Sequence, residues 1–168
     1  MPEMAMVLRI IVSILLGIAA HTDIRARIIP NIITAAVATA GLLHAGVEGF
    51  LFSAGHLALV GGLFAVCVGL FAAGAIGGGD AKLVPAVALG LPVASWPAFL
   101  FVMAIAGGMV ALVMLLRERM GGRRSAGART GVETAALAAD PAAAELRGGV
   151  PYGVAIAAGG LVALWLPA

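Results

Sequence analysis

Six long apolar runs limit what this chain can fold into. Each run is continuous rather than alternating, and most approach the roughly 20 residues that a helix needs to cross a bilayer. Of the 168 residues, 62% are hydrophobic and 11% are charged, whereas soluble domains average about half apolar and a quarter charged. The sequence therefore predicts an all-α, polytopic membrane helical bundle of about six transmembrane helices, built as a single domain over 1–168. The runs cover 4–21, 31–46, 54–76, 83–94, 97–116 and 150–167.

Two of these runs permit another interpretation. The run 83–94 contains Pro85, Gly90 and Pro92, so a re-entrant segment is an alternative to a full span. The run 4–21 contains Arg9 and has the charged start and apolar middle of a signal peptide. We favour a membrane span for it, because five more apolar runs follow, and we expect Arg9 to reach the nearer interface.

The basic residues predict the orientation of the bundle. Nine of the ten Lys and Arg residues follow the first, third and fifth runs, and alternating spans bring these loops to one side. The positive-inside rule makes that side cytoplasmic and places both chain ends outside. The stretch 117–149 is rich in Ala, Gly and Arg and predicts a flexible cytoplasmic loop with a short helix at 141–147. The nine residues are Arg25, Arg27, Lys82, Arg117, Arg119, Arg123, Arg124, Arg129 and Arg147.

The sequence gives no sign of a metal, a cofactor or a nucleic-acid partner. Cys67 is the single cysteine and lies in an apolar run, so no internal disulfide can form. His21, His44 and His56 lack the spacing of metal ligands and are interpreted as interfacial residues. No aromatic residues are interleaved with the basic ones, as a nucleic-acid surface would require.

Two aspartates stand out in so apolar a chain. Asp23 follows the first run and Asp80 follows the third, and both runs cross in the same direction, so the two carboxylates reach the same membrane face. An Asp near a low-dielectric region is costly without a partner or a function. Two facing carboxylates share one proton, so one can take a proton from water while the other donates one. Asp140 precedes a proline in the 117–149 loop and is interpreted as a turn residue.

Three short motifs then carry a family resemblance. The stretch "GGGD" at 77–80 fits the GxGD pattern of membrane aspartyl proteases. Together with "DIRARIIPN" at 23–31 and "VPYGVAIAAGG" at 150–160, it resembles the type IV prepilin peptidase family. The chain is most similar to the small tight-adherence (Flp-type) pilus prepilin peptidases.

The resemblance implies an activity and a site. The catalytic pair of the family falls on Asp23 and Asp80, and the implied reaction removes the leader of prepilins or pseudopilins at the cytoplasmic face of the bacterial inner membrane. The implied partners are these substrates, the lipid bilayer and a pilus or secretion machinery. Longer members carry cytoplasmic CxxC pairs and also N-methylate the product. No CxxC pair occurs here, so that second activity is not carried over.

The residues around the two aspartates are expected to support the site. Gly77, Gly78 and Gly79 would admit an extended substrate backbone beside Asp80. Lys82 would hold the loop, meet a substrate carboxylate or anchor the chain at the interface. The remaining candidates lie in the 23–31 stretch: Arg25 and Arg27 as interface anchors that also brace the loop, Pro30 as a helix start, and Asn31 as a cap or brace.

Two other functions fit part of the pattern. A transporter subunit could relay protons through Asp23 and Asp80, but its ionisable groups usually lie near the bilayer midplane rather than at segment ends. A non-catalytic assembly factor of a secretion complex would tolerate Asp→Asn changes at both positions.

Overall fold

The computed structural model describes residues 2–121 and 152–166, and this part of the chain is helical, without strands. Four helices are long and apolar enough to cross a membrane: α1, α2, α3 and the stretch Val93–Arg117, which includes most of α5. The expected all-α membrane bundle is confirmed. The elements are α1 (Pro2–Ala26), α2 (Asn31–Glu48), α3 (Ala54–Ala72), α4 (Gly78–Leu89), the 3-10 helix η1 (Val93–Ser95), α5 (Trp96–Gly121) and α8 (Tyr152–Trp165).

Residues in the left-handed region mark several of the bends between helices. Arg27 follows α1 with φ 53°, and its N–H bonds the Asp23 carbonyl at 2.9 Å. Gly49 ends α2 with φ 85° and donates its N–H to Ala45 at 3.0 Å. Gly74, after α3, has φ 71°. Glycine adopts such angles without a Cβ clash, whereas Arg27 adopts one at a cost.

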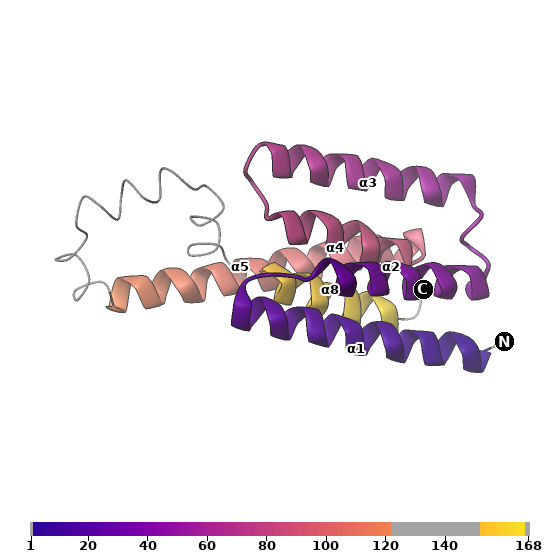
Figure 1. Ribbon diagram of the computed structural model, residues 1–168, viewed down its shortest axis with the longest axis horizontal. Helices are drawn as coiled ribbons and strands as arrows, with labels where there is room; N and C mark the ends of the chain where they lie inside the picture. The colour runs from indigo at the N-terminus through magenta and orange to yellow at the C-terminus, as the bar shows by residue number, and fades with distance from the viewer. Residues whose placement is uncertain (1, 122–151, 167–168) are drawn as a thin grey trace.

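The helices run along a common direction, and α5 extends on the left beyond the ends of the other helices (Figure 1). Figure 1 shows α1, α3 and α5 ending on the left, where α2, α4 and α8 begin. Helix α4 lies in the middle and packs against α2, α3 and α8, while α8 also packs against α1 and α5. The C-terminal end of α1 carries Asp23, and the C-terminal end of α3 precedes Asp80. Both therefore lie at the same end of the bundle.

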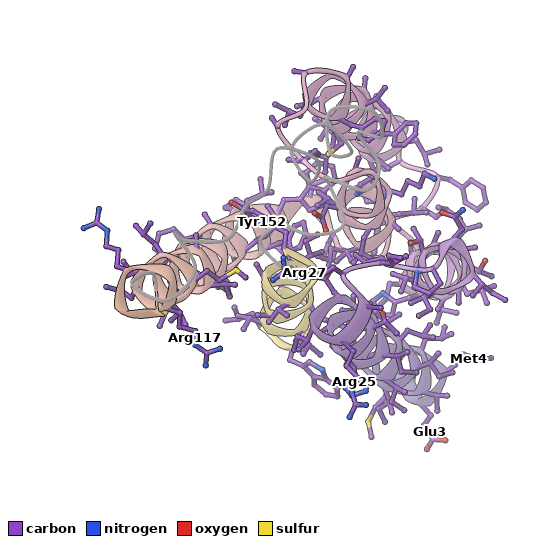
Figure 2. The ribbon with its side chains drawn as sticks, turned by 60° about the vertical axis from the view of Figure 1, so that its left-hand side comes forward. Glu3, Met4, Arg25, Arg27, Arg117 and Tyr152 are labelled. Carbon is purple, nitrogen blue, oxygen red and sulfur yellow. The ribbon has the colours of Figure 1, made fainter. Side chains whose placement is uncertain are left out.

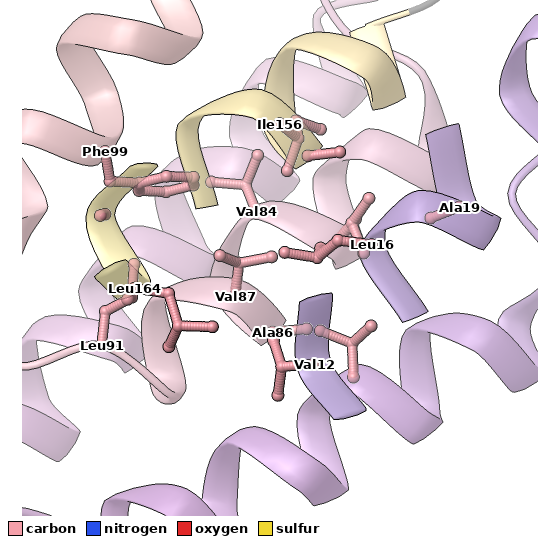
Figure 3. Packing of buried hydrophobic residues seen from close by; sticks show 14 of the residues in the cluster. Val12, Leu16, Ala19, Val84, Ala86, Val87, Leu91, Phe99, Ile156 and Leu164 are labelled. Carbon is pink, nitrogen blue, oxygen red and sulfur yellow. The ribbon is translucent and has the colours of Figure 1, made fainter. Parts of the chain in front are cut away.

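The core forms where apolar stripes from three helices meet. On α1 the buried positions recur every three or four residues, at Ala5, Leu8, Val12, Leu16, Ala19 and Asp23. Figure 3 shows Leu16 beside Val84 and Val87 of α4 and Ile156 of α8. Small residues allow close approach: a Cβ on Gly90 would lie 2.8 Å from the Gly41 Cα. The stripe on α1 continues to Asp23, so the packing of α1 aims this carboxylate inward.

Helix α4 differs from the segment expected at 83–94. It begins five residues earlier, at Gly78, and ends at Leu89, so Asp80 lies inside its first turn. Its 12 residues extend about 18 Å, well short of the roughly 30 Å hydrocarbon core. Pro85 lies inside the helix rather than ending it. The short, buried α4 does not match a full span and is compatible with the re-entrant alternative.

Two of the histidines were interpreted wrongly from the sequence. His44 and His56 are each 2% exposed and lie in the protein interior. The His44 ring bonds the Gly90 carbonyl at 3.0 Å, and Arg9 donates its Nε–H to His44 Nε2 at 3.1 Å. His56 Nε2 lies 3.2 Å from the Leu89 carbonyl. The two rings bond backbone carbonyls that have no helical partner where α4 ends. Arg9, which was expected only to reach the interface, instead bonds both His44 and Glu48.

The loop expected at 117–149 starts later than the composition suggested. Helix α5 continues to Gly121, so Arg117 and Arg119 lie on a helix. The rest of that loop, with the short helix expected at 141–147 and Asp140, lies outside the described residues.

Candidate active site

Asp23 lies in the last turn of α1 and is 6% exposed. Its Oδ2 accepts the backbone N–H of Gly153 at 2.7 Å, across 130 residues of sequence. Gly153 is the second residue of α8, whose first N–H groups have no partner within the helix. The positive end of the α8 dipole and a short hydrogen bond therefore stabilise the anionic form of the Asp23 carboxylate.

Asp80 lies in the first turn of α4 and is half-buried. This turn is outside the four helices long enough to span a membrane. Burial raises the pKa of Asp80 from 3.8 to about 7, the negative charge of Asp23 adds to the increase, and a hydrogen bond from Gly77 opposes it. The fold thus brings the two aspartates, 57 residues apart in sequence, within electrostatic reach of each other.

The three glycines before Asp80 contact protein atoms. A Cβ on Gly78 would lie 3.2 Å from the Phe71 ring, and one on Gly79 would lie 3.1 Å from the Ile29 Cβ. Gly77 precedes the helix with φ −70°, an angle that any residue adopts, but its Cβ would lie 3.3 Å from Asp80 Oδ2. These glycines let the start of α4 pack closely against the segments around it, a role that is independent of a substrate.

The basic residues of the 23–31 stretch have separate environments. Arg25 is exposed, whereas Arg27 is half-buried and interacts electrostatically with Asp23. Figure 2 shows Arg25 and Arg27 at the end of the bundle that also carries Tyr152, the first residue of α8.

Pro30 and Asn31 begin α2, as the sequence predicted, but without a side-chain cap. Pro30 occupies the N-cap position, and the Asn31 side chain instead accepts a hydrogen bond from Lys82 Nζ at 3.2 Å. Lys82 is exposed, and this bond ties α4 to the start of α2. Of the two roles expected for Asn31, the structure supports the brace.

Gly153 is a site residue that the sequence did not single out. A Cβ at this position would lie 2.7 Å from Asp23 Oδ2 and 2.9 Å from its Cβ and Cγ, so only glycine allows the carboxylate to reach the α8 backbone. The signal was present in the stretch "PYG" at 151–153, where a glycine follows the start of an apolar helix. Its partner, however, lies 130 residues away and was not visible from spacing.

No group of three His, Cys, Asp or Glu side chains in 2–121 or 152–166 is placed to hold a metal ion. What the site offers is a pair of carboxylates in unequal environments. One is held by a helix N-terminus, and the other has a pKa near neutrality. Such a pair can take a proton from water at one oxygen and deliver a proton from another.

One of three comparisons with known proteins finds a match. Searches of curated proteins and of solved structures find no match to the chain. A family model, described as the type IV leader peptidase family, matches residues 10–112 and so includes both aspartates. This match covers more than half of the 168 residues. The chain therefore belongs to the type IV leader peptidase family.

Proposed function

We propose that the protein is an aspartic endopeptidase that removes the leader of prepilins or pseudopilins at the cytoplasmic face of the bacterial inner membrane. The observation that carries the proposal is the pairing of buried Asp23 and half-buried Asp80 at one end of the bundle, in different environments. The motifs of the sequence favour Flp-type pilins as the substrate.

The unequal environments suggest a division of roles. In this division Asp23 acts in the anionic form, which the Gly153 N–H favours, and removes a proton from water, and the hydroxide attacks the scissile carbonyl carbon. Asp80, protonated below about pH 7, donates its proton to the carbonyl oxygen. When the tetrahedral intermediate collapses, the proton on Asp23 passes to the leaving amine nitrogen, and the C–N bond breaks. The proton of the intermediate's hydroxyl returns to Asp80, which restores the starting pair.

The orientation of the bundle supports the proposed face. Arg25 and Arg27 lie at the C-terminal end of α1, Lys82 lies near the start of α4, and Arg117 and Arg119 lie near the C-terminal end of α5. These helix ends point to the same side of the bundle (Figure 1). An excess of Lys and Arg is typical of the cytoplasmic side. A leader that ends just before an apolar helix would present its scissile bond at this depth.

Reconstitution tests the proposal. The purified protein in liposomes should shorten a Flp-type prepilin, and N-terminal sequencing should find a new terminus before the apolar helix. Asp23→Asn and Asp80→Asn should each abolish the shortening, whereas Asp140→Asn should leave it unchanged as the control. Normal processing by either of the first two variants would rule out the dyad and favour an assembly role.

A further inference from the structure

A groove lies on the side of the bundle where α2 and α3 flank α4. It encloses about 590 Å³ and is lined by one face of each helix, with positions spaced three and four residues apart over 31–38, 57–64 and 82–89. Seven residues of helix rise roughly 10 Å, so the groove is about two turns long. Several of its lining side chains are exposed, among them Phe64 at 47%. The groove therefore opens sideways, toward the bilayer.

One end of the groove is polar and lies next to the candidate active site. Lys82 and Asn31 line this end and are joined by the 3.2 Å hydrogen bond between them. Lys82 is two residues beyond Asp80 on the same helix. Within the described residues Lys82 forms no salt bridge, and its hydrogen-bond acceptor is a neutral amide, so its charge is not neutralised by a carboxylate there. The walls beyond this end are otherwise mostly apolar.

Thr34, on the wall formed by α2, is buried in an unusual way. It is 8% exposed, and its Oγ1 has no hydrogen-bond partner in the described part of the chain. Leaving a buried hydroxyl unpaired costs about 1–3 kcal/mol. A threonine in a helix can bond the carbonyl one turn earlier, but that bond does not form here, and protein atoms cover the oxygen.

We propose that this groove is the docking site for the apolar helix of the substrate that follows the scissile bond. In this arrangement Lys82 pairs with an acidic side chain near the start of that helix. The inference rests on the proposed function. The polar end and its position beside Asp80 favour this occupant, because a helix seated in the groove places the residues before it at the two aspartates.

Two adjacent glycines on α3 give a matched test of the docking site. Gly61 lines the groove and Gly62 does not, while both are exposed and have no atom within 4 Å of an added Cβ. Gly61→Phe should fill the groove and raise the KM for a full-length prepilin by at least about tenfold, equivalent to 1.4 kcal/mol of binding. Gly62→Phe should leave the KM unchanged. Equal effects of the two substitutions would overturn the proposal.

A charge exchange and a cross-link identify the occupant. Lys82→Glu should impair cleavage of a prepilin with an acidic residue early in its helix, and changing that residue to lysine should restore it. With Asp80→Asn and Cys67→Ala in place, a cysteine at Ala38 should form a disulfide with a cysteine in the substrate helix, whereas one at Met109 on α5 should not. A substrate disulfide from Met109 as strong as that from Ala38 would contradict docking.

Three results separate the inference from the proposed function. If the wild type cleaves, Asp80→Asn does not, and Gly61→Phe has a wild-type KM, the groove has no part in substrate binding and the enzyme assignment stands. If Gly61→Phe only reduces the phospholipid that copurifies with the protein, the groove holds lipid. Cleavage by Asp80→Asn would instead refute the enzyme mechanism itself.

Discussion

Replacing Gly153 with alanine tests whether the backbone of α8 holds Asp23 for catalysis. The added Cβ would lie 2.7 Å from Asp23 Oδ2 and 2.9 Å from two of its carbon atoms. Nonbonded carbon atoms prefer separations of about 3.5–4.0 Å, so the carboxylate must retreat by roughly half an ångström or more. That retreat breaks or lengthens the 2.7 Å hydrogen bond from the Gly153 N–H.

The geometry gives the size of the expected effect. Hydrogen bonds to charged groups contribute about 1.5–3 kcal/mol, which corresponds to roughly 10- to 150-fold in rate. Displacement of a catalytic group by about 1 Å can cost on the order of 100-fold. We therefore expect Gly153→Ala to lower kcat/KM for leader removal by about 100-fold. Its acidic limb should also move to higher pH, because Asp23 loses a donor that favours its charged form.

Gly160→Ala, on the same helix, is the matched control. Its Cβ would be equally crowded, at 2.9 Å from the side-chain ends of Leu16 and Val87, but these contacts lie in the apolar core. The assay compares kcat/KM per folded molecule for both variants, with thermal unfolding in detergent measured in parallel. Gly160→Ala should lower the melting temperature and leave the pH profile in place. A normal rate and profile for Gly153→Ala would refute the positioning role.

Three further predictions concern the charge, the packing and the orientation of the site. The folded protein holds a proton on Asp80 that the unfolded chain releases above pH 3.8, so the stability that this proton confers is complete below pH 3.8 and is lost as pH rises through about 7. At pH 8 Asp80→Asn should therefore be more stable than the wild type, by at most about 4 kcal/mol in the free energy of unfolding because the side chain is partly exposed. At pH 4 the two proteins should melt at similar temperatures, and a stability difference independent of pH would contradict the assigned burial. Gly79→Ala should lower the melting temperature because its Cβ would lie 3.1 Å from the Ile29 Cβ. The loss should be smaller in an Ile29→Gly background, which lacks that atom, and an equal loss in both backgrounds would show that these two positions do not compete for space. Single cysteines at Ser125 and Ser53, in a background without the native cysteine, should label from opposite sides of the membrane, and labelling of Ser125 from outside in intact cells would reverse the proposed orientation.

The helical architecture followed from the sequence because bilayer thickness imposes long apolar runs. The runs and the alternation of basic residues also place Asp23 and Asp80 at one end, and the structure brings these two residues within electrostatic reach. The start of α4 was missed because three glycines in a row resemble a helix end, whereas here the second and third lie in the first turn. Glycine weakens an isolated helix, but close packing against Phe71 and Ile29 outweighs that preference.

Contacts between distant segments were beyond the reach of sequence patterns. The bond between Asp23 and Gly153 joins the first and last described helices. The burial of His44 depends on the Gly90 carbonyl and on Arg9, which come from two other parts of the chain. Periodicity indicates which face of a helix is buried but not which polar group meets it there, so both interactions required the folded structure.

The central claim is that Asp23 and Asp80 act as one catalytic unit, and a double-mutant comparison tests it most directly. Leader removal would be measured for Asp23→Asn, Asp80→Asn and the double variant, each purified in the folded state and compared with the wild type. The account predicts that each single variant loses nearly as much kcat/KM as the double variant, because residues that act as a unit have non-additive effects. Losses that multiply in the double variant, or a single variant that processes prepilin normally, would contradict it.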